Sequence, residues 1–254
     1  MANKKANQPQ TVGIPIDNNP LARNYKREYK KWLSDFRKTP YFPVIEDTLF
    51  QRKVRKNAFI PYLELCSSFH KRTQPDHKLI LFVSCNPSGR EEAYYGQRNL
   101  TQDDFCYYDQ ADSIYNQIED FVSVLGLTGV DFAMADVFPI VRSDQDVLKK
   151  AWKNKKVDLL PLTSLFKNVV CEIQPTVIVS INAFVTSLFG EGKLSNNTPT
   201  PVSIKGDLYY KLSYDKGFET VAFCGGMLTG KHAMDKHSKL RLIHDVHEYL
   251  ISHP

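Results

Sequence analysis

The sequence predicts an α/β fold, a three-layer α/β/α sandwich around a mainly parallel central sheet. Three short apolar runs support this prediction, because unbroken apolar runs are typical of strands buried on both faces of a parallel sheet. Each run stops at small, polar or glycine-rich residues: Leu79–Val83 before Ser84-Cys85-Asn86-Pro87-Ser88-Gly89, Thr176–Ile181 before Asn182-Ala183, and Thr220–Cys224 before Gly225-Gly226. Helical patterns separate the runs, and this alternation is the second indication. Open α/β sheets bind ligands at the carboxyl ends of their strands, so we expect one cleft built from several of these loops.

The N-terminal half is expected to begin with helices and to continue into the first strands. Asn19–Lys38 has apolar and aromatic residues at helical spacing among many Lys and Arg, which indicates an amphipathic helix with a basic face. The other elements expected here are a helical region over Tyr41–Leu65 that is interrupted near Pro43 and Pro61, a strand over Lys78–Ser84, a helix over Asp112–Leu125 and a strand over Val130–Val137. The loop Cys85–Tyr108 carries several aromatic residues, and loops of this length are usually functional or disordered.

The C-terminal half continues the alternation of helix and strand and adds a hairpin. The expected elements are a helix over about Leu159–Ile173, a strand over Thr176–Ile181, a helix around Ala183–Leu188, a loop over Glu191–Pro201, a hairpin of Leu208–Leu212 with Thr220–Cys224 around Asp215-Lys216-Gly217, and a final helix over about Asp235–Ile251. The turn residues between the two hairpin strands favour antiparallel pairing at this end of the sheet.

The length and composition favour one domain with a large core. The chain has 254 residues, of which 42% are hydrophobic. A chain of this size folds more often as one domain than as two. We expect residues 1–18 to form a disordered tail and residues 19–254 a single α/β domain, with residues 19–77 as a helical N-terminal arm.

The net charge and the cysteine spacing indicate which partners and which cellular compartment suit this protein. The 33 basic and 28 acidic residues give a net charge of +5, which suits a polyanionic partner and equally suits a solvated basic surface. The five cysteines show no paired spacing, which indicates reduced thiols in a cytoplasmic protein and argues against an iron–sulfur cluster. No apolar stretch reaches the length of a membrane span, and the N-terminus lacks the apolar segment of a signal peptide, so we expect no membrane association.

Several segments, taken in order, resemble the uracil-DNA glycosylase superfamily over roughly residues 79–250. Ser84-Cys85-Asn86-Pro87-Ser88-Gly89 is similar to the first motif in its Asn-Pro form, which the mismatch-specific and single-strand-selective branches use. The segments that resemble the later motifs are Asp112–Gly126, Phe132–Pro139 with Asp136 at the base-reading position, Ile173–Phe184, and Ala222–Leu240 in the place of the final motif. The resemblance implies a DNA glycosylase of this fold that acts on a flipped nucleotide.

The chain departs from the pattern of the family at two positions that carry chemistry. The final loop, Cys224–His232, has no His-Pro-Ser, so the histidine expected near Gly225 is absent. Asp136 stands where the family commonly has Asn. An ionised Asp offers only acceptors. Asp136 is therefore protonated, or the pocket prefers a base that presents donors, or the site does not read uracil.

The resemblance implies a role for each candidate residue. Asn86 would position the attacking water, and His232 would replace the missing histidine as an electrostatic stabiliser of the departing base. The base-binding candidates are Pro87, Tyr95, Phe105 and Asp136, the two aromatic residues stacking on the base. The DNA-binding candidates are Gly226, Met227, Leu228, Lys231 and Lys236, with Met227 and Leu228 as an apolar wedge and the lysines on phosphates.

Each of these residues also has an ordinary structural interpretation. Asn86-Pro87 can form a simple turn after a buried strand, and the aromatic residues and Leu228 can be packed side chains. Gly225-x-x-x-x-Gly230-Lys231 resembles a phosphate-binding loop between a strand and a helix, although His232 follows where Ser or Thr would bind magnesium. His244 and His247 could share a helix face, but no third metal ligand has a compatible spacing.

The sequence therefore predicts a monomeric DNA base-excision glycosylase of DNA repair, a hydrolase of the N-glycosidic bond that uses no metal or organic cofactor. The alternative is a non-catalytic protein that binds nucleic acid or a nucleotide on the same fold. Loss of the final-motif histidine and Asp136 in place of Asn favour this alternative, whereas Asn86-Pro87 and the aromatic loop favour the enzyme.

Overall fold

The computed structural model describes residues 20–38, 74, 76–86, 113–138, 145–154, 158–204, 207–228 and 233–253. Among the expectations from sequence, the tail over residues 1–18, the helical region over Tyr41–Leu65 and most of the loop Cys85–Tyr108 lie outside these residues.

Within the described residues, six strands form one open, mostly parallel sheet in the order β2-β1-β3-β6-β5-β4. The strands are β1 (Lys78–Ser84), β2 (Val130–Asp136), β3 (Val177–Ser180), β4 (Thr200–Ile204), β5 (Asp207–Ser213) and β6 (Glu219–Cys224). The four strands β2, β1, β3 and β6 are parallel, and β5 and β4 extend this sheet by antiparallel pairing. The parallel strands are almost fully buried, as their apolar runs predict.

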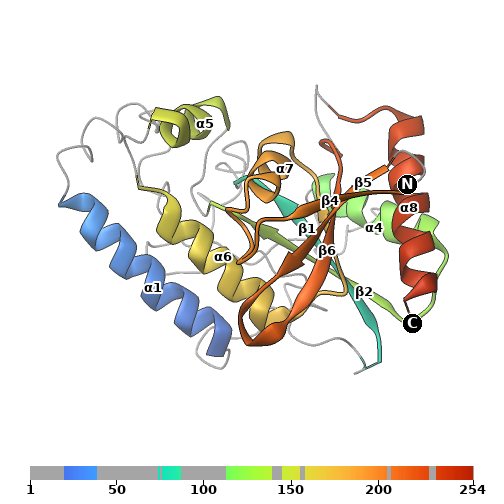
Figure 1. The fold of residues 1–254 in the computed structure, drawn as a ribbon, viewed down its shortest axis with the longest axis horizontal. Helices are drawn as coiled ribbons and strands as arrows, with labels where there is room; N and C mark the ends of the chain where they lie inside the picture. The colour runs from blue at the N-terminus through green and yellow to red at the C-terminus, as the bar shows by residue number, and fades with distance from the viewer. Residues whose placement is uncertain are drawn as a thin grey trace, which may run out of the picture.

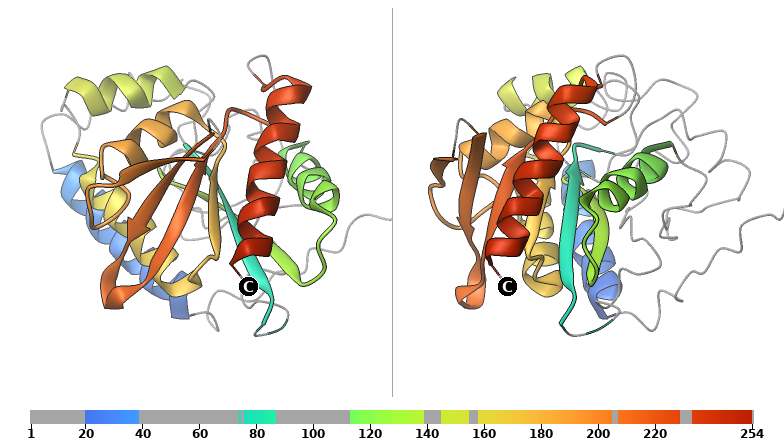
Figure 2. Two further views of the ribbon diagram at one scale, coloured as in Figure 1. Left: turned by 45° about the vertical axis from the view of Figure 1, so that its right-hand side comes forward. Right: turned by 90° about the vertical axis from the view of Figure 1, so that its right-hand side faces the viewer.

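Helices lie on both faces of the sheet (Figure 1, Figure 2). The helices are α1 (Pro20–Arg37), α4 (Ser113–Leu125), α5 (Gln145–Asn154), α6 (Leu160–Ile173), α7 (Ala183–Gly190) and α8 (Lys236–Ser252), with a 3₁₀ turn at Asp215–Gly217. On one face, the rings of Phe82 in β1 and Phe121 in α4 meet edge to face at 5.2 Å. On the same face, Phe223 in β6 contacts Tyr249 in α8. Helices α6 and α7 cover the opposite face, with α1 packed outside α6.

Side chains on a strand alternate between the two faces of the sheet. The contacts of Phe82 and Phe223 therefore show which face the other side chains of these strands are on. Ser84 lies two residues after Phe82 and therefore shares the α4 and α8 face. Its register partner across the β1–β2 ladder is Asp136. Ser180 in β3 faces the other side, where its hydroxyl shares a hydrogen bond of 2.9 Å with that of Thr186 in α7.

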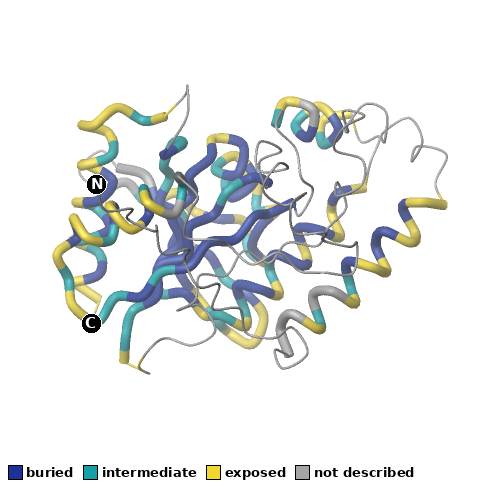
Figure 3. The backbone as a smooth tube through the Cα atoms, turned by 180° about the vertical axis from the view of Figure 1, so that it is seen from behind, coloured by how far each residue is buried: buried dark blue, intermediate teal, exposed yellow. Residues whose placement is uncertain are grey.

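The N-terminal helix α1 belongs to the same hydrophobic core as the sheet. Its buried side chains are Tyr29, Trp32, Leu33 and Phe36, at the spacing of one helix face. The indole of Trp32 donates a hydrogen bond of 3.1 Å to the carbonyl of Asp158, immediately before α6. Figure 3 shows buried residues concentrated in the central strands and exposed residues along the outer side of α1. The amphipathic helix expected over Asn19–Lys38 is confirmed, and those of its basic side chains that the structure describes are exposed.

The predicted α/β class is confirmed, with a mostly parallel sheet and helices on both faces. The strand predicted over Lys78–Ser84 has these bounds in the structure, and the other predicted helices and strands agree within about two residues where described. Two elements were not expected, α5 and β4. The segment assigned to a loop ends in β4, which contains Pro201. This strand is at the edge of the sheet, where proline is tolerated because one side of the strand needs no partner.

Replacement of Phe82 by Ala should destabilise the fold severely. The side chain is fully buried against Phe121, so removal of the ring leaves a cavity at the centre of the sheet. We expect a loss of about 3–5 kcal/mol in the free energy of unfolding, measured by urea denaturation. Val124→Ala on α4 is the control, because Val124 is 57% exposed and should change the same quantity by less than about 0.5 kcal/mol. A Phe82→Ala loss as small as that of the control would contradict this account of the core.

Candidate functional site

The ends of the four parallel strands meet at one edge of the sheet, and backbone hydrogen bonds hold the residues that follow them. Val137 N donates to Ser84 O at 3.1 Å, and Phe138 N to Cys85 O at 2.9 Å. On the other side of β1, where β3 pairs with it, Ile181 N donates to Val83 O at 2.9 Å. Between β3 and β6, Gly225 N donates to Ser180 O at 2.8 Å. The pairing of the strands thus continues for one or two residues into the loops. The first residues of these loops therefore have fixed positions relative to one another.

Asn86 and Asp136 occupy neighbouring positions at this edge. Asp136 ends β2 opposite Ser84, and Asn86 follows Cys85, whose carbonyl is bonded to Phe138. Both polar side chains are buried, with 5% and 6% of their surfaces exposed. The chain leaves β1 toward β2 on one side and later enters β3 on the other side, so β1 borders the point where the strand order reverses. Ligands of open α/β sheets bind at such a point. Two of the predicted site residues are therefore brought together at the expected place.

The pKa of the Cys85 thiol shows which charged groups act at this edge. Burial raises the pKa of Cys85 well above its ordinary value, the charge of Asp136 raises it further, and the charge of Lys149 lowers it. The thiol therefore stays protonated and unreactive at neutral pH. The same influences indicate that a carboxylate from β2 and an ammonium from α5 both act at the end of β1.

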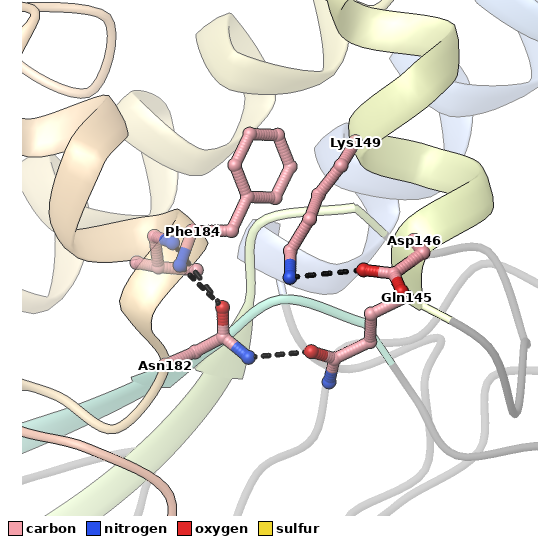
Figure 4. A network of polar contacts seen from close by, with 6 residues as sticks. Gln145, Asp146, Lys149, Asn182 and Phe184 are labelled. Carbon is pink, nitrogen blue, oxygen red and sulfur yellow. Dashed lines mark hydrogen bonds and ion pairs between the residues drawn. The ribbon is translucent and has the colours of Figure 1, made fainter.

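Helix α5 is attached to the strand-end edge through Asn182 (Figure 4). Asn182 is the N-cap of α7, and its side-chain oxygen accepts hydrogen bonds from Phe184 N at 2.9 Å and Val185 N at 3.3 Å. Its amide nitrogen donates to Gln145 Oε1 at 2.7 Å. One side chain after β3 therefore both begins α7 and holds the first residue of α5.

An aromatic cluster holds the other end of α5. Trp152 contacts Phe138, which follows β2, and Phe184 in α7, with ring centroids at 6.0 and 6.5 Å. Phe138 and Phe184 also stack on each other at 6.1 Å. Phe138 and Phe184 are buried, so they act as packing residues that fix α5 over the edge, and neither offers an open face for a ligand.

The glycine pair after β6 is explained by close packing. A Cβ on Gly225 would lie 2.8 Å from the carbonyl oxygen of Ser180 and from a methyl group of Leu242, and one on Gly226 would lie 2.7 Å from Met234. The amide of Gly225 donates to Ser180 O, and that of Gly226 points to the sulfur of Met234 at 3.0 Å. Both amides are engaged within the fold, which argues against a phosphate cradle at these two residues.

The DNA-binding candidates beside the glycines occupy different environments. Met227 is half-buried, and its carbonyl accepts a hydrogen bond from Met234 N at 2.8 Å. Leu228 is buried in the core, as expected for a packed side chain. A wedge from this loop would therefore consist of Met227. Lys236 is exposed at the first position of α8, next to the N-cap Asp235. Hydrogen bonds from Ser238 and His237 lower the pKa of Asp235 and favour its ionised form.

Ser180, Thr186 and Cys224 form a polar cluster that supports the ends of β3 and β6 from the opposite face. Besides its bond to Thr186, the Ser180 hydroxyl donates to the carbonyl of Asn182 at 3.2 Å. Burial raises the pKa of the Cys224 thiol to about 11, while a hydrogen bond from Thr186 partly opposes the shift. The protonated thiol and the two hydroxyls form a neutral contact between β3, β6 and α7, so we assign them a structural role.

Five candidates lie outside the described residues: Pro87, Tyr95, Phe105, Lys231 and His232. Their predicted roles stay predictions. Within the described residues, no group of three or more His, Cys, Asp or Glu side chains is arranged to hold a metal ion. None of the helices in the described ranges combines the length and apolar character that a membrane span requires.

Sequence reasoning missed helix α5 and its side chains Gln145 and Lys149. The signal was present, because Leu148, Ala151 and Trp152 have the spacing of a helix face in a segment rich in helix formers. What no pattern indicated is that this helix lies across the ends of strands that are distant in the sequence.

Asn182→Ala should destabilise the protein more than Gln145→Ala. The first change removes the cap of α7 and should cost about 1–2 kcal/mol in the free energy of unfolding. The second removes only the contact with α5, and water can replace Gln145 because it is partly exposed, so we expect less than about 1 kcal/mol. Urea denaturation of both variants measures the difference. Equal losses would mean that Asn182 stabilises the protein mainly through its hydrogen bond to Gln145 and not through the cap of α7.

Neither the protein-family models nor the curated proteins give a significant match to this chain.

Proposed function

We propose that this protein is a DNA glycosylase of the uracil-DNA-glycosylase type, which hydrolyses the N-glycosidic bond of a flipped nucleotide. The observation that carries the proposal is the pair Asn86 and Asp136, two buried polar side chains at the ends of adjoining parallel strands. A buried amide and a buried carboxylate at neighbouring strand ends are suited to orient one water molecule and to recognise one base. The resemblance of the ordered motifs agrees with this assignment.

The reaction requires an attacking water, a recognised base and stabilisation of the leaving group. The amide of Asn86 would orient the water toward the anomeric carbon of the sugar. The carboxyl group of Asp136 would recognise the base, and if it is ionised it accepts hydrogen bonds only, which favours bases that present amino or imino donors. Because both side chains are buried, their interactions with a bound base would be stronger than in water.

The DNA itself would lie along the loop that joins β6 to α8. Met227 would fill the gap left by the flipped base. Lys236, exposed at the first position of α8, would contact a phosphate. In the same proposal, Pro87, Tyr95 and Phe105 bind the base. Lys231 contacts a phosphate, and His232 stabilises the departing base.

The alternative is a protein that binds nucleic acid or a nucleotide without cleavage. Asp136 favours it, because a carboxylate at the base-reading position resists further negative charge on a departing base. The absence of a histidine near Gly225 also favours it, because no side chain at that position would stabilise the negative charge. The two functions share the strand-end site and differ only in whether a base is released.

Base release from a panel of oligonucleotides tests the proposal. The panel holds uracil, hypoxanthine, xanthine and alkylated bases in single-stranded and double-stranded DNA, and alkali cleavage reveals the abasic sites. We expect release of at least one base by the wild-type protein. We expect Asn86→Ala to lower this rate by at least about 100-fold with little change in DNA affinity, because only the water would lose its ligand. Retained DNA binding without release of any base would favour the alternative, and equal rates for the variant would remove Asn86 from the mechanism.

Lys236→Ala should weaken DNA binding without changing the choice of base. A lysine on a phosphate contributes through counterion release, so the slope of log K against log salt should fall by about 1. Fluorescence anisotropy of a labelled oligonucleotide at several salt concentrations measures the slope. Lys31→Ala is the matched control, because Lys31 is exposed on α1, on the other side of the sheet from α8. Equal slopes for the two variants would exclude a phosphate contact by Lys236.

A further inference from the structure

One face of α5 is directed at the strand-end edge, and Lys149 is on that face. Gln145, Lys149 and Trp152 follow one another at i, i+4 and i+7, so their side chains share one side of the helix. The first contacts Asn182 after β3, and the last contacts Phe138 after β2. Lys149 lies between these two anchors. Figure 4 shows its side chain on the same side of α5 as the Gln145 amide.

The charge of Lys149 is available to a ligand at this edge. Its ammonium forms an ion pair of 3.2 Å with Asp146, but the two side chains are 38% and 70% exposed. Exposed pairs of this kind contribute little to stability, so a stronger partner can displace Asp146. The effect of Lys149 on the buried Cys85 thiol, together with that of Asp136, indicates that its charge acts at the end of β1.

We propose that Lys149 is a catalytic residue of this site, a cation that acts beside His232 to stabilise the negative charge developing on the departing base. This inference rests on the proposed glycosylase function. It assigns a role to a residue on α5, a helix outside every segment that carries the family resemblance. It also gives α5 a function, which is to hold an ammonium over the ends of β1 and β2.

The reaction balances with water as the only co-reactant. The bond between the sugar C1′ and the base nitrogen breaks, and its electron pair stays on the base. The water oxygen forms a new bond to C1′, and the proton that the water loses ends on the released base, directly or through solvent. The products are an abasic sugar and a neutral base. Negative charge is greatest on the base while the first bond breaks, and the ammonium of Lys149 would act at that stage.

The departures of this chain from the family pattern favour such a cation, in addition to the proposed role of His232. Gly225 stands where the family has its histidine, so the end of β6 supplies no side chain to the departing base. The amides of Gly225 and Gly226 are engaged within the fold. An ionised Asp136 would oppose negative charge on the base, and a positive charge near the same strand end would offset it. Removal of one such electrostatic contact typically lowers kcat by about 100-fold to 1,000-fold.

The test compares single-turnover rates of base release for Lys149→Ala and Lys149→Arg with two matched controls. We expect a loss of about 100-fold or more for Lys149→Ala, with unchanged DNA affinity, and partial recovery for Lys149→Arg, which keeps the charge. Lys150→Ala removes the exposed neighbouring charge on α5, and Asp146→Ala removes the counter-ion of Lys149. Both controls should keep the wild-type rate within about threefold. Thermal unfolding of each variant verifies that the fold is intact.

A second measurement separates leaving-group stabilisation from a structural role. The substrate is the panel base that the wild-type protein releases, paired with an analogue of it that leaves more readily. For uracil this pair is uracil and 5-fluorouracil. The loss caused by Lys149→Ala should be at least tenfold smaller for the better leaving group, because less charge needs stabilisation. Equal losses for both bases, or an undiminished rate, would overturn the role of Lys149 and leave the glycosylase function standing. No release by the wild-type protein would overturn both.

Discussion

The candidate site depends on the parallel pairing of β1 with a neighbour on each side. Ser84 is in register with Asp136 on one side, and Val83 is in register with Ser180 on the other. Backbone hydrogen bonds continue this pairing past the last strand residues, through Val137, Phe138 and Ile181. A shift of one residue in either ladder would turn Asp136 or Ser180 to the opposite face. The five buried residues Leu79–Val83 prevent such a shift because they need partners on both faces.

The strand ends would remain an open edge without the elements that pack across them. Asn182 caps α7 and binds Gln145, while Trp152 joins Phe138 and Phe184. Each contact serves the packing of the fold, and together they fix α5 over the site. The proposed role of Lys149 follows from this attachment, since a flexible lysine becomes a positioned charge only when its helix is held at both ends.

The end of β6 is packed so closely that Gly225 has no room for a side chain. Gly225 is in contact with Ser180 O and Leu242, so a side chain at this position would clash in the present packing. The glycine therefore lets α8 pack close to the sheet and places no side chain at the end of β6. In the proposed mechanism, Lys149 on helix α5 supplies a positive charge that no side chain at the end of β6 provides. The binding alternative needs no such charge, and the base-release measurements distinguish the two.

The sequence alone determined the α/β class, the bounds of β1 and the amphipathic character of α1, because these depend on local periodicity and on residues adjacent in the chain. It also placed Asn86 and Asp136 at the strand ends, since each lies within two residues of the end of a recognisable buried strand. Only the tertiary structure decided the strand order and that Leu228 is buried. It also decided that α5 lies across the strand ends with Lys149 on its inner face. These features depend on contacts between residues far apart in the sequence, such as Asn182 with Gln145 and Trp152 with Phe184, and no local pattern encodes which distant side chains will meet.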